Sequence, residues 1–384
     1  MPEKRYLVTP GPTPVPPEVL AVTAAPMIHH RGPDFRGTLE RVIRGLQEVF
    51  RTESEMLTFT SAGTGVMESA VQNLCSPGDR VLVVSHGYFG ERFAAIAQTY
   101  SCDLVHLRYP WGETPIPDEV AAKLDESGEA KVVFLTHSDT STGVVSDLQA
   151  IAERLNGTDS ILVVDAISSL AAVPLETDAW GLDVVITSSH KALMCPPGLA
   201  FASVSPRAFD LAGQATSPRY YFDWERTRAS QAKGENPFSP AISLYRGLEV
   251  ALRMILDEGL EAAHERHVRL GRACRAGVKA MGLELFSPDE DRAAVVTAIR
   301  MPADIDGQAI VLAMREASGV TIIGGQGELR GKIVRVGHIG YVDVFDVTTA
   351  LAALELALAQ AGADVERAVA VTAALEAYNE PVTV

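Results

Sequence analysis

Five short apolar segments constrain the fold of this chain more than any other feature. They cover residues 80–85, 131–136, 161–165, 183–188 and 199–204. Helical patterns separate most of them. Strands that are apolar on both faces and alternate with helices form parallel sheets with helices on both sides. The pattern therefore predicts an α/β fold with a mostly parallel central sheet between helices.

The helical patterns and the later segments predict the domain organisation. Helices are expected over residues 39–50, 64–74, 148–155 and 241–255, where apolar side chains recur at helical spacing. A smaller α+β unit should follow, with strands at 293–300, 320–323 and 332–336 and a helix over 347–359. We predict an extended, proline-rich arm (1–20), a large domain (21–257), a small C-terminal domain (258–362), and a C-terminal helix and tail (363–384).

Composition excludes several classes of protein. The 384 residues are 47% hydrophobic, which is ordinary for a globular chain, and the net charge is −16. An acidic surface repels nucleic acid and anionic membranes, so neither is an expected partner. No apolar run reaches the ~18 residues of a membrane span. The four cysteines form no CxxC pair, which argues against metal clusters and disulfides and favours the cytoplasm.

Polar residues follow several of the predicted strands, and this is where a site is expected. Ligands of parallel α/β sheets bind beyond the carboxyl ends of the strands. The polar segments at these ends are residues 85–87, 136–142, 165–168 and 188–191.

Four features of the sequence could carry chemistry there. Residues 61–65, Ser-Ala-Gly-Thr-Gly, open a predicted helix and suit a phosphate, although a plain capped loop has the same pattern. Asp165 ends an apolar strand and needs a cation or a donor, which a salt bridge would also supply. Lys191 lies in an apolar context that suits a Schiff-base nucleophile, and a surface lysine is the alternative. Arg335, on an apolar strand, requires a carboxylate from the protein or from a substrate.

Together these features match the requirements of pyridoxal phosphate chemistry. Lys191 would carry the cofactor, Asp165 would keep the pyridine nitrogen protonated, and Arg335 would hold a substrate carboxylate.

The sequence also resembles a known family over nearly its whole length. It resembles the class V (fold type I) pyridoxal-phosphate-dependent aminotransferases, in the alanine–glyoxylate, serine–glyoxylate and serine–pyruvate branch. The similar blocks occur in order along the chain: TPGPTPVPPEVL, SAGTGVMESAVQN, PGDRVLV, GYFGER, LTHSDTSTGV, VVDAISSL, SSHKALMCPPGLAF, PAISLY and GGQGELRGKIVRVGHIG.

The resemblance implies a role for each residue that matches the family's pattern. Lys191 would be the catalytic lysine, and Asp165 would be its partner at the pyridine nitrogen. The other cofactor-binding residues would be Ala62, Gly63 and Thr64 at the phosphate, Phe89 and Ile167 at the ring faces, Ser141 or Thr142 at the ring hydroxyl or substrate, and His190 at the phosphate. Arg335 and Gly11 would contact the substrate. A partner subunit would complete the phosphate site through residues 236–239, which implies a homodimer with shared active sites.

Three positions depart from the family's pattern. His190 stands where many relatives have Gln, so its charge should depend on pH. Ser239 replaces a usual Thr, and Phe89 replaces the Trp of some members. His29 and His30 are adjacent but point in different directions, so no metal site is expected.

The expected activity is transfer of an amino group from alanine or serine to glyoxylate or another small 2-oxo acid, by ping-pong chemistry. One alternative is cysteine desulfuration, for which Cys274 is the only cysteine beyond residue 200, and it lies on a predicted helix. Another is a non-catalytic subunit of the kind that relatives labelled as soluble hydrogenase small subunits suggest.

Overall fold

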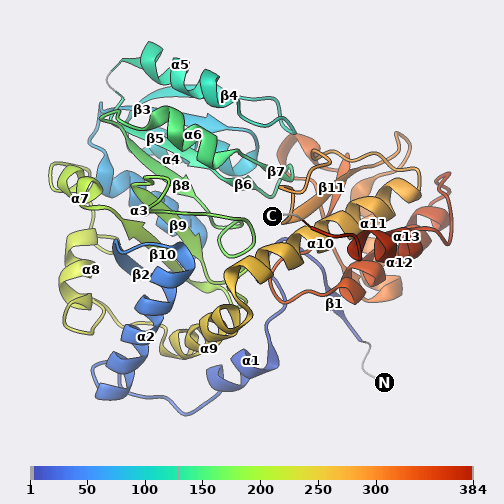
Figure 1. Cartoon of the computed structure of the whole chain (residues 1–384), viewed down its shortest axis with the longest axis horizontal. Helices are drawn as coiled ribbons and strands as arrows, with labels where there is room; N and C mark the ends of the chain where they lie inside the picture. Colours follow the sequence, from blue (N-terminus) through green and yellow to red (C-terminus); the bar gives the residue numbers. More distant parts are fainter. Residues whose placement is uncertain (1–3, 129, 383–384) are drawn as a thin grey trace.

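A seven-stranded sheet forms the centre of the protein (Figure 1). The computed structural model describes residues 4–128 and 130–382, so residues 1–3 of the predicted arm and 383–384 of the predicted tail lie outside the described residues. The strand order is β2-β10-β9-β8-β5-β3-β4. The strands are β2 (Glu55–Ser61), β3 (Arg80–Ser85), β4 (Asp103–Arg108), β5 (Val132–Thr136), β8 (Ile161–Asp165), β9 (Val184–Ser188) and β10 (Gly198–Val204). The predicted α/β class with a mostly parallel sheet is confirmed.

One predicted strand runs against the rest of the sheet. β10 pairs antiparallel with both β2 and β9, whereas the other neighbouring strands pair in parallel. Parallel neighbours need a crossover of about a dozen residues or more, and the link 189–197 between β9 and β10 is too short for one. The strands β2 and β4 were not predicted. β4 is an edge strand whose residues are only partly buried, which weakens the apolar signal.

Helices bury both faces of the sheet, as the apolar strands require. Alternate residues face opposite sides, so Leu82 and Val84 join one core cluster and Val81 and Val83 join the other. One face is covered by α2 (Pro33–Phe50), α5 (Pro117–Ser127), α6 (Leu148–Leu155) and α9 (Ile242–Glu258). The other face is covered by α3 (Gly63–Leu74), α4 (Tyr88–Thr99), α7 (Pro206–Ala212) and α8 (Trp224–Gln231).

A second core lies in the C-terminal third, drawn in orange and red in Figure 1. A three-stranded antiparallel sheet, β11-β14-β13, packs with helices there. The elements are α10 (Leu260–Ala280), β11 (Val296–Arg300), α11 (Gly307–Ser318), β12 (Val320–Thr321), β13 (Ile323–Gly324), a 3-10 turn (Gly327–Leu329), β14 (Ile333–Gly337), α12 (Val344–Gln360) and α13 (Ala370–Tyr378). The predicted strand 320–323 is thus divided between β12 and β13. The domain boundaries remain predictions. No helix in the described part of the chain has the length and apolar character needed to cross a membrane.

The N-terminal arm joins the two cores. β1 (Tyr6–Leu7) pairs in parallel with β12, and Gly337 N–H donates to Val8 O at 3.0 Å. The arm then reaches the link after β9, where Thr13 Oγ1 donates to Lys191 O at 3.0 Å. Its extended course ends earlier than predicted, because α1 (Pro17–Thr23) begins at Pro17. A proline is well suited to the first turn of a helix, where its missing N–H has no role.

The arm crosses Gly337 so closely that a side chain there has no room. A Cβ at Gly337 would overlap the backbone of Thr9 and Pro10. We expect Gly337→Ala to lower the free energy of unfolding by ~1–3 kcal/mol, since overpacking forces the backbone to shift. Urea unfolding would measure the change. Gly213→Ala is the matched control, because the nearest atom to its new Cβ would be 3.5 Å away. Equal stability of the two variants would contradict this packing.

Candidate active site

The polar segments predicted at the carboxyl ends of the strands converge at one edge of the central sheet (Figure 1). The loops after β3, β5, β8 and β9 meet there because these strands are parallel neighbours in the sheet. The arm and strand β14 reach the same edge, through contacts of Pro10 with Lys191 and of Arg335 with Thr140.

Lys191 lies in the link after β9 and is 8% exposed. Its ammonium donates to Pro10 O at 2.6 Å, so the arm contacts the amine directly. Gly11 follows at φ 144, and a Cβ there would overlap the lysine side chain. Burial lowers the pKa of Lys191 to about 8, although attraction to the Asp165 carboxylate opposes the shift. The alternative of a solvated surface lysine is therefore wrong.

Asp165 ends β8 and is 3% exposed. Its Oδ1 accepts a hydrogen bond from Ile167 N–H at 2.9 Å. Burial raises the pKa of Asp165 to about 7, and the hydrogen bond from Ile167 offsets only part of the shift. The ion pairs of the described residues do not include Asp165. A buried carboxylate that forms no ion pair with the described residues favours a ligand that brings a positive charge or a proton to it.

Ala62, Gly63 and Thr64 form the amino end of α3, beside Asp165. Ala62 is the N-cap residue and no side chain caps the helix. Gly65 N–H donates to Ala62 O at 3.0 Å, so the N–H groups of Gly63 and Thr64 are the ones that could bind an anion. A Cβ on Gly63 would come within 2.6 Å of Ile167 Cδ1, so only glycine lets this turn pack against Ile167. The predicted phosphate-binding residues and the loop after β8 are thereby held together.

A buried carboxylate that the sequence analysis did not single out connects two of the predicted groups. Asp139, in β6 (Ser138–Asp139), accepts hydrogen bonds from Phe89 N–H at 2.8 Å and Gly90 N–H at 3.2 Å. It also accepts from Ser141 N–H at 3.0 Å and Ser141 Oγ at 2.5 Å. Ser141 Oγ in turn accepts from Tyr88 N–H at 2.8 Å. Asp139 thus fixes the amino end of α4, with Phe89, relative to Ser141.

Thr142 is also buried, but its hydroxyl is used within its own turn. Its Oγ1 donates to Asp139 O at 3.3 Å and accepts from Val144 N–H, at the start of β7 (Val144–Val145), at 3.4 Å. The prediction left Ser141 and Thr142 as alternatives for contacting the ring hydroxyl or the substrate. These bonds leave the choice open.

Arg335, in the middle of β14, is 2% exposed and has no carboxylate partner among the ion pairs of the described residues. Its guanidinium donates to Gly324 O at 2.7 and 3.0 Å and to Thr140 O at 2.6 Å. It therefore links the C-terminal core to the loop after β5. Burial lowers the pKa of Arg335 to about 10, and the Asp139 charge opposes the shift. Of the two predicted partners, a carboxylate of the described part of the protein does not pair with Arg335, and the substrate carboxylate stays a prediction.

His190 precedes Lys191, and its ring is held neutral. Burial lowers the pKa of His190 to about 4, and the charge of Lys191 acts in the same direction. Without a phosphate beside it, His190 is therefore neutral near pH 7. Its Nδ1 is buried without a hydrogen-bond partner in the described structure, and so is Ser188 Oγ at the end of β9. Unpaired buried polar atoms at this edge indicate that a polar ligand belongs there.

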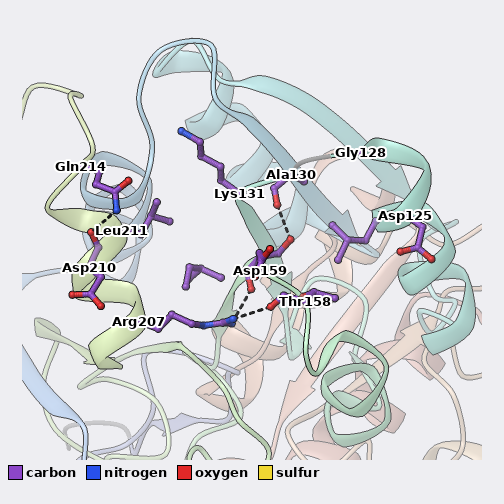
Figure 2. A pocket seen from close by; sticks show the side chains of 13 residues that line it. Asp125, Gly128, Ala130, Lys131, Thr158, Asp159, Arg207, Asp210, Leu211 and Gln214 are labelled. Carbon is purple, nitrogen blue, oxygen red and sulfur yellow. Dashed lines mark hydrogen bonds between the residues drawn. The ribbon is translucent and has the colours of Figure 1, made fainter.

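A pocket on the opposite edge of the sheet is lined by none of the predicted site residues (Figure 2). It lies at the amino ends of β5 and β8, where Lys131 and Ser160 line it. Its Arg207 is already bound, to Asp183 and to the carbonyls of Thr158 and Ser160. Elsewhere in the described part of the chain, no three His, Cys, Asp or Glu side chains are grouped to hold a metal.

Comparisons with known proteins identify the family. The model of the family described as Aminotransferase class-V matches residues 5–335. A relative named "Soluble hydrogenase, small subunit" from Synechococcus is 40% identical, over 94% of this chain and 95% of that protein. The L-aspartate–glyoxylate aminotransferase of Paracoccus denitrificans is 34% identical, over 99% and 98%. The crystal structure of ureidoglycine–glyoxylate aminotransferase from Bacillus subtilis has a TM-score of 0.92 at 30% identity, over 99% of both chains.

The chain belongs to the class V aminotransferases. It is a pyridoxal-phosphate-dependent enzyme of the branch that contains the glyoxylate aminotransferases, as its sequence predicted. The residues at the sheet edge fit this cofactor. The buried amine suits its aldehyde, and the buried carboxylate suits its ring nitrogen. The uncapped helix end and the unpaired polar atoms suit its phosphate.

The lowered basicity of Lys191 has a measurable consequence. With a pKa of about 8, half of the amine is neutral at about pH 8, and only the neutral amine attacks an aldehyde. The rate at which the ligand-free protein captures pyridoxal phosphate should rise with pH, reach half its maximum near pH 8 and level off about one pH unit higher. Stopped-flow absorbance would follow the capture, with Lys191→Ala as the background. A rate that rises without a plateau to pH 10 would show that the amine is not desolvated.

Proposed function

We propose that this enzyme transfers an amino group from a small L-amino acid, alanine or serine, to glyoxylate or another small 2-oxo acid. The observation that carries the proposal is the buried Lys191 amine between the arm and the carboxyl edge of the sheet, within electrostatic reach of both Asp165 and Arg335. Relatives named as glyoxylate aminotransferases support the acceptor. The two half-reactions would share this one site in ping-pong order.

Three side chains divide the work in this proposal. Arg335 binds the substrate α-carboxylate through a charge-assisted pair and thereby orients the Cα–H bond. Lys191 would remove the proton from Cα and deliver it to the carbon that was the cofactor's aldehyde carbon, a 1,3-shift that leaves the amino group on the cofactor. Asp165 keeps a proton on the ring nitrogen. Pyridoxal phosphate, when bound, supplies the ring that accepts the electron pair left at Cα.

The surrounding residues support these steps. Pro10 and Gly11 cover the lysine and limit the access of water to it. We propose that Phe89 and Ile167 pack on the two ring faces and that Ala62, Gly63, Thr64 and His190 hold the phosphate. Asp139 would hold Phe89 and Ser141 in fixed positions relative to each other through its hydrogen bonds to both.

The assembly and location in this proposal follow from the same residues. A homodimer is supported by aromatic side chains near the 236–239 segment: Tyr221 stacks on Phe238, and Tyr220 is 68% exposed. The partner subunit would complete the phosphate site through this segment. Four free cysteines support the cytoplasm as the location.

Neither of the other activities is favoured by the site. Desulfuration needs a reactive thiolate, but Cys274 is fully buried in α10 and burial raises the pKa of its thiol to about 11. The hydrogenase name belongs to a relative and implies redox metals. Stoichiometric iron or nickel in the purified protein would support that name and overturn the present proposal.

The absorption spectrum of the purified protein tests the proposal most directly. We expect a visible cofactor band that bleaches with alanine or serine and returns with glyoxylate. Lys191→Ala should lack the protein-bound band and lose nearly all turnover. Bleaching by aspartate but by neither alanine nor serine would contradict the proposed donors. The absence of any band after addition of pyridoxal phosphate would contradict the site itself.

The role of Arg335 is tested separately. Arg335→Ala should weaken the binding of donor and acceptor alike, because each loses a charge-assisted pair of about 1.5–3 kcal/mol. Half-reaction titrations would measure both affinities. Arg300→Ala, on the exposed end of the neighbouring strand β11, is the matched control. Unchanged affinity for both acids in the Arg335 variant would show that their carboxylates bind elsewhere.

A further inference from the structure

One cation at the site has no assigned role. Arg92 lies on the first turns of α4, beside the amino end of α3. Its Nη1 donates to Thr64 Oγ1 at 2.8 Å. Its guanidinium carbon lies 4.8 Å from the centre of the Phe89 ring and 5.4 Å from that of Tyr88. Arg92 thus contacts one residue proposed for the phosphate and one proposed for a ring face.

Arg92 has a charge that the described protein does not neutralise. It is partly buried, and the ion pairs of the described residues do not include it. Its neighbour Glu91 pairs with His106 and Arg108 instead. The positive charge reaches the site, since Arg92 acts to lower the pKa of both Asp165 and Lys191. An arginine in this position is available for an anionic ligand.

The phosphate site proposed at the amino end of α3 has little positive charge of its own. A phosphate monoester carries about −1.5 to −2 at pH 7, whereas a helix end supplies only about half a positive charge. In the ligand-free protein His190 contributes none, because burial lowers its pKa to about 4. Lys191 is committed to the cofactor's aldehyde. A buried phosphate with so little compensation would be strongly disfavoured.

We propose that Arg92 is a cofactor-binding residue that pairs with the phosphate of pyridoxal phosphate. The inference rests on the proposed location of the phosphate at Ala62–Thr64. Since Thr64 Oγ1 already accepts from Arg92, its own hydroxyl proton is free to donate toward the phosphate. The same guanidinium holds the Phe89 ring by a cation–π contact, so it couples the phosphate end of the site to the ring face.

A different use of Arg92 is recognition of a second carboxylate on the substrate. The geometry favours the phosphate, because the hydrogen bond of Arg92 is to the α3 end, whereas the arginine proposed for the substrate lies on β14. The two uses predict different results, because only phosphate binding by Arg92 depends on the cofactor's phosphate.

The decisive measurement compares pyridoxal phosphate with pyridoxal, which lacks the phosphate. The dissociation constants of both for the ligand-free full-length protein give the phosphate preference of each variant. In Arg92→Gln this preference should fall roughly tenfold to a hundredfold, the range for loss of one charge-assisted bond. Arg108→Gln, which removes the same charge from an exposed position near α4, should retain the wild-type preference. Arg92→Lys should fall between them, because it keeps the charge but not the planar fork.

Each other outcome has a definite meaning. An unchanged phosphate preference in both Arg92 variants overturns the inference. An unchanged phosphate preference together with a selective loss of aspartate turnover would assign Arg92 to the substrate's side-chain carboxylate instead. If the wild-type protein itself shows no phosphate preference, the proposed phosphate site fails, whatever Arg92 does. Circular dichroism and melting of the ligand-free variants separate loss of binding from loss of fold, and Arg92→Lys keeps the test open if Arg92→Gln does not fold.

Discussion

The burial of the Lys191 amine is the constraint on which the rest of the site depends. A lysine inside a protein is stable only if its environment supplies an acceptor and limits its charge. Here the acceptor is Pro10 O, 2.6 Å away, and burial lowers the pKa of the amine to about 8. Both conditions require the N-terminal arm to lie across the carboxyl edge of the sheet. The arm is held in turn by β12 and Gly337 of the C-terminal core. The chemistry of one side chain therefore depends on contacts between three distant parts of the chain.

The sequence predicted the parts of this arrangement that local pattern determines. Strands 80–85 and 161–165 and helix 148–155 have the predicted bounds, because apolar residues flanked by turn signals define them without reference to the rest of the fold. Lys191 and Asp165 could be singled out for a similar reason. Each is a polar residue that follows an apolar strand, and the carboxyl ends of such strands are where ligands bind.

What the sequence did not show depends on the folded neighbours. The direction of β10 follows from the short link 189–197, which matters only once β9 and β10 are known to be neighbours. Asp139 is one acid within a run of small polar residues, and its importance arises from donors on α4. Arg92 belongs to the block GYFGER, in which only Phe89 has an expected role, and its hydrogen bond to Thr64 joins α4 to α3. The neutrality of His190 follows from burial, which a single position in a sequence does not reveal.

The distribution of charge shows how an acidic protein can hold anionic ligands. The net charge of −16 repels a phosphate and a carboxylate at long range, but salt screens such a field within about 8 Å at physiological ionic strength. At the site itself, positive charge predominates. Lys191, Arg335 and Arg92 converge there, whereas the Asp139 carboxylate accepts hydrogen bonds from N–H groups of α4 and the Asp165 carboxylate accepts one from Ile167. Burial strengthens each of these short-range attractions, because few water molecules compete for the same groups. In this proposal, affinity for the ligands is set by a few cations at the site, of which Lys191 and Arg335 are buried and Arg92 is partly buried. The acidic surface can then serve solubility without opposing catalysis.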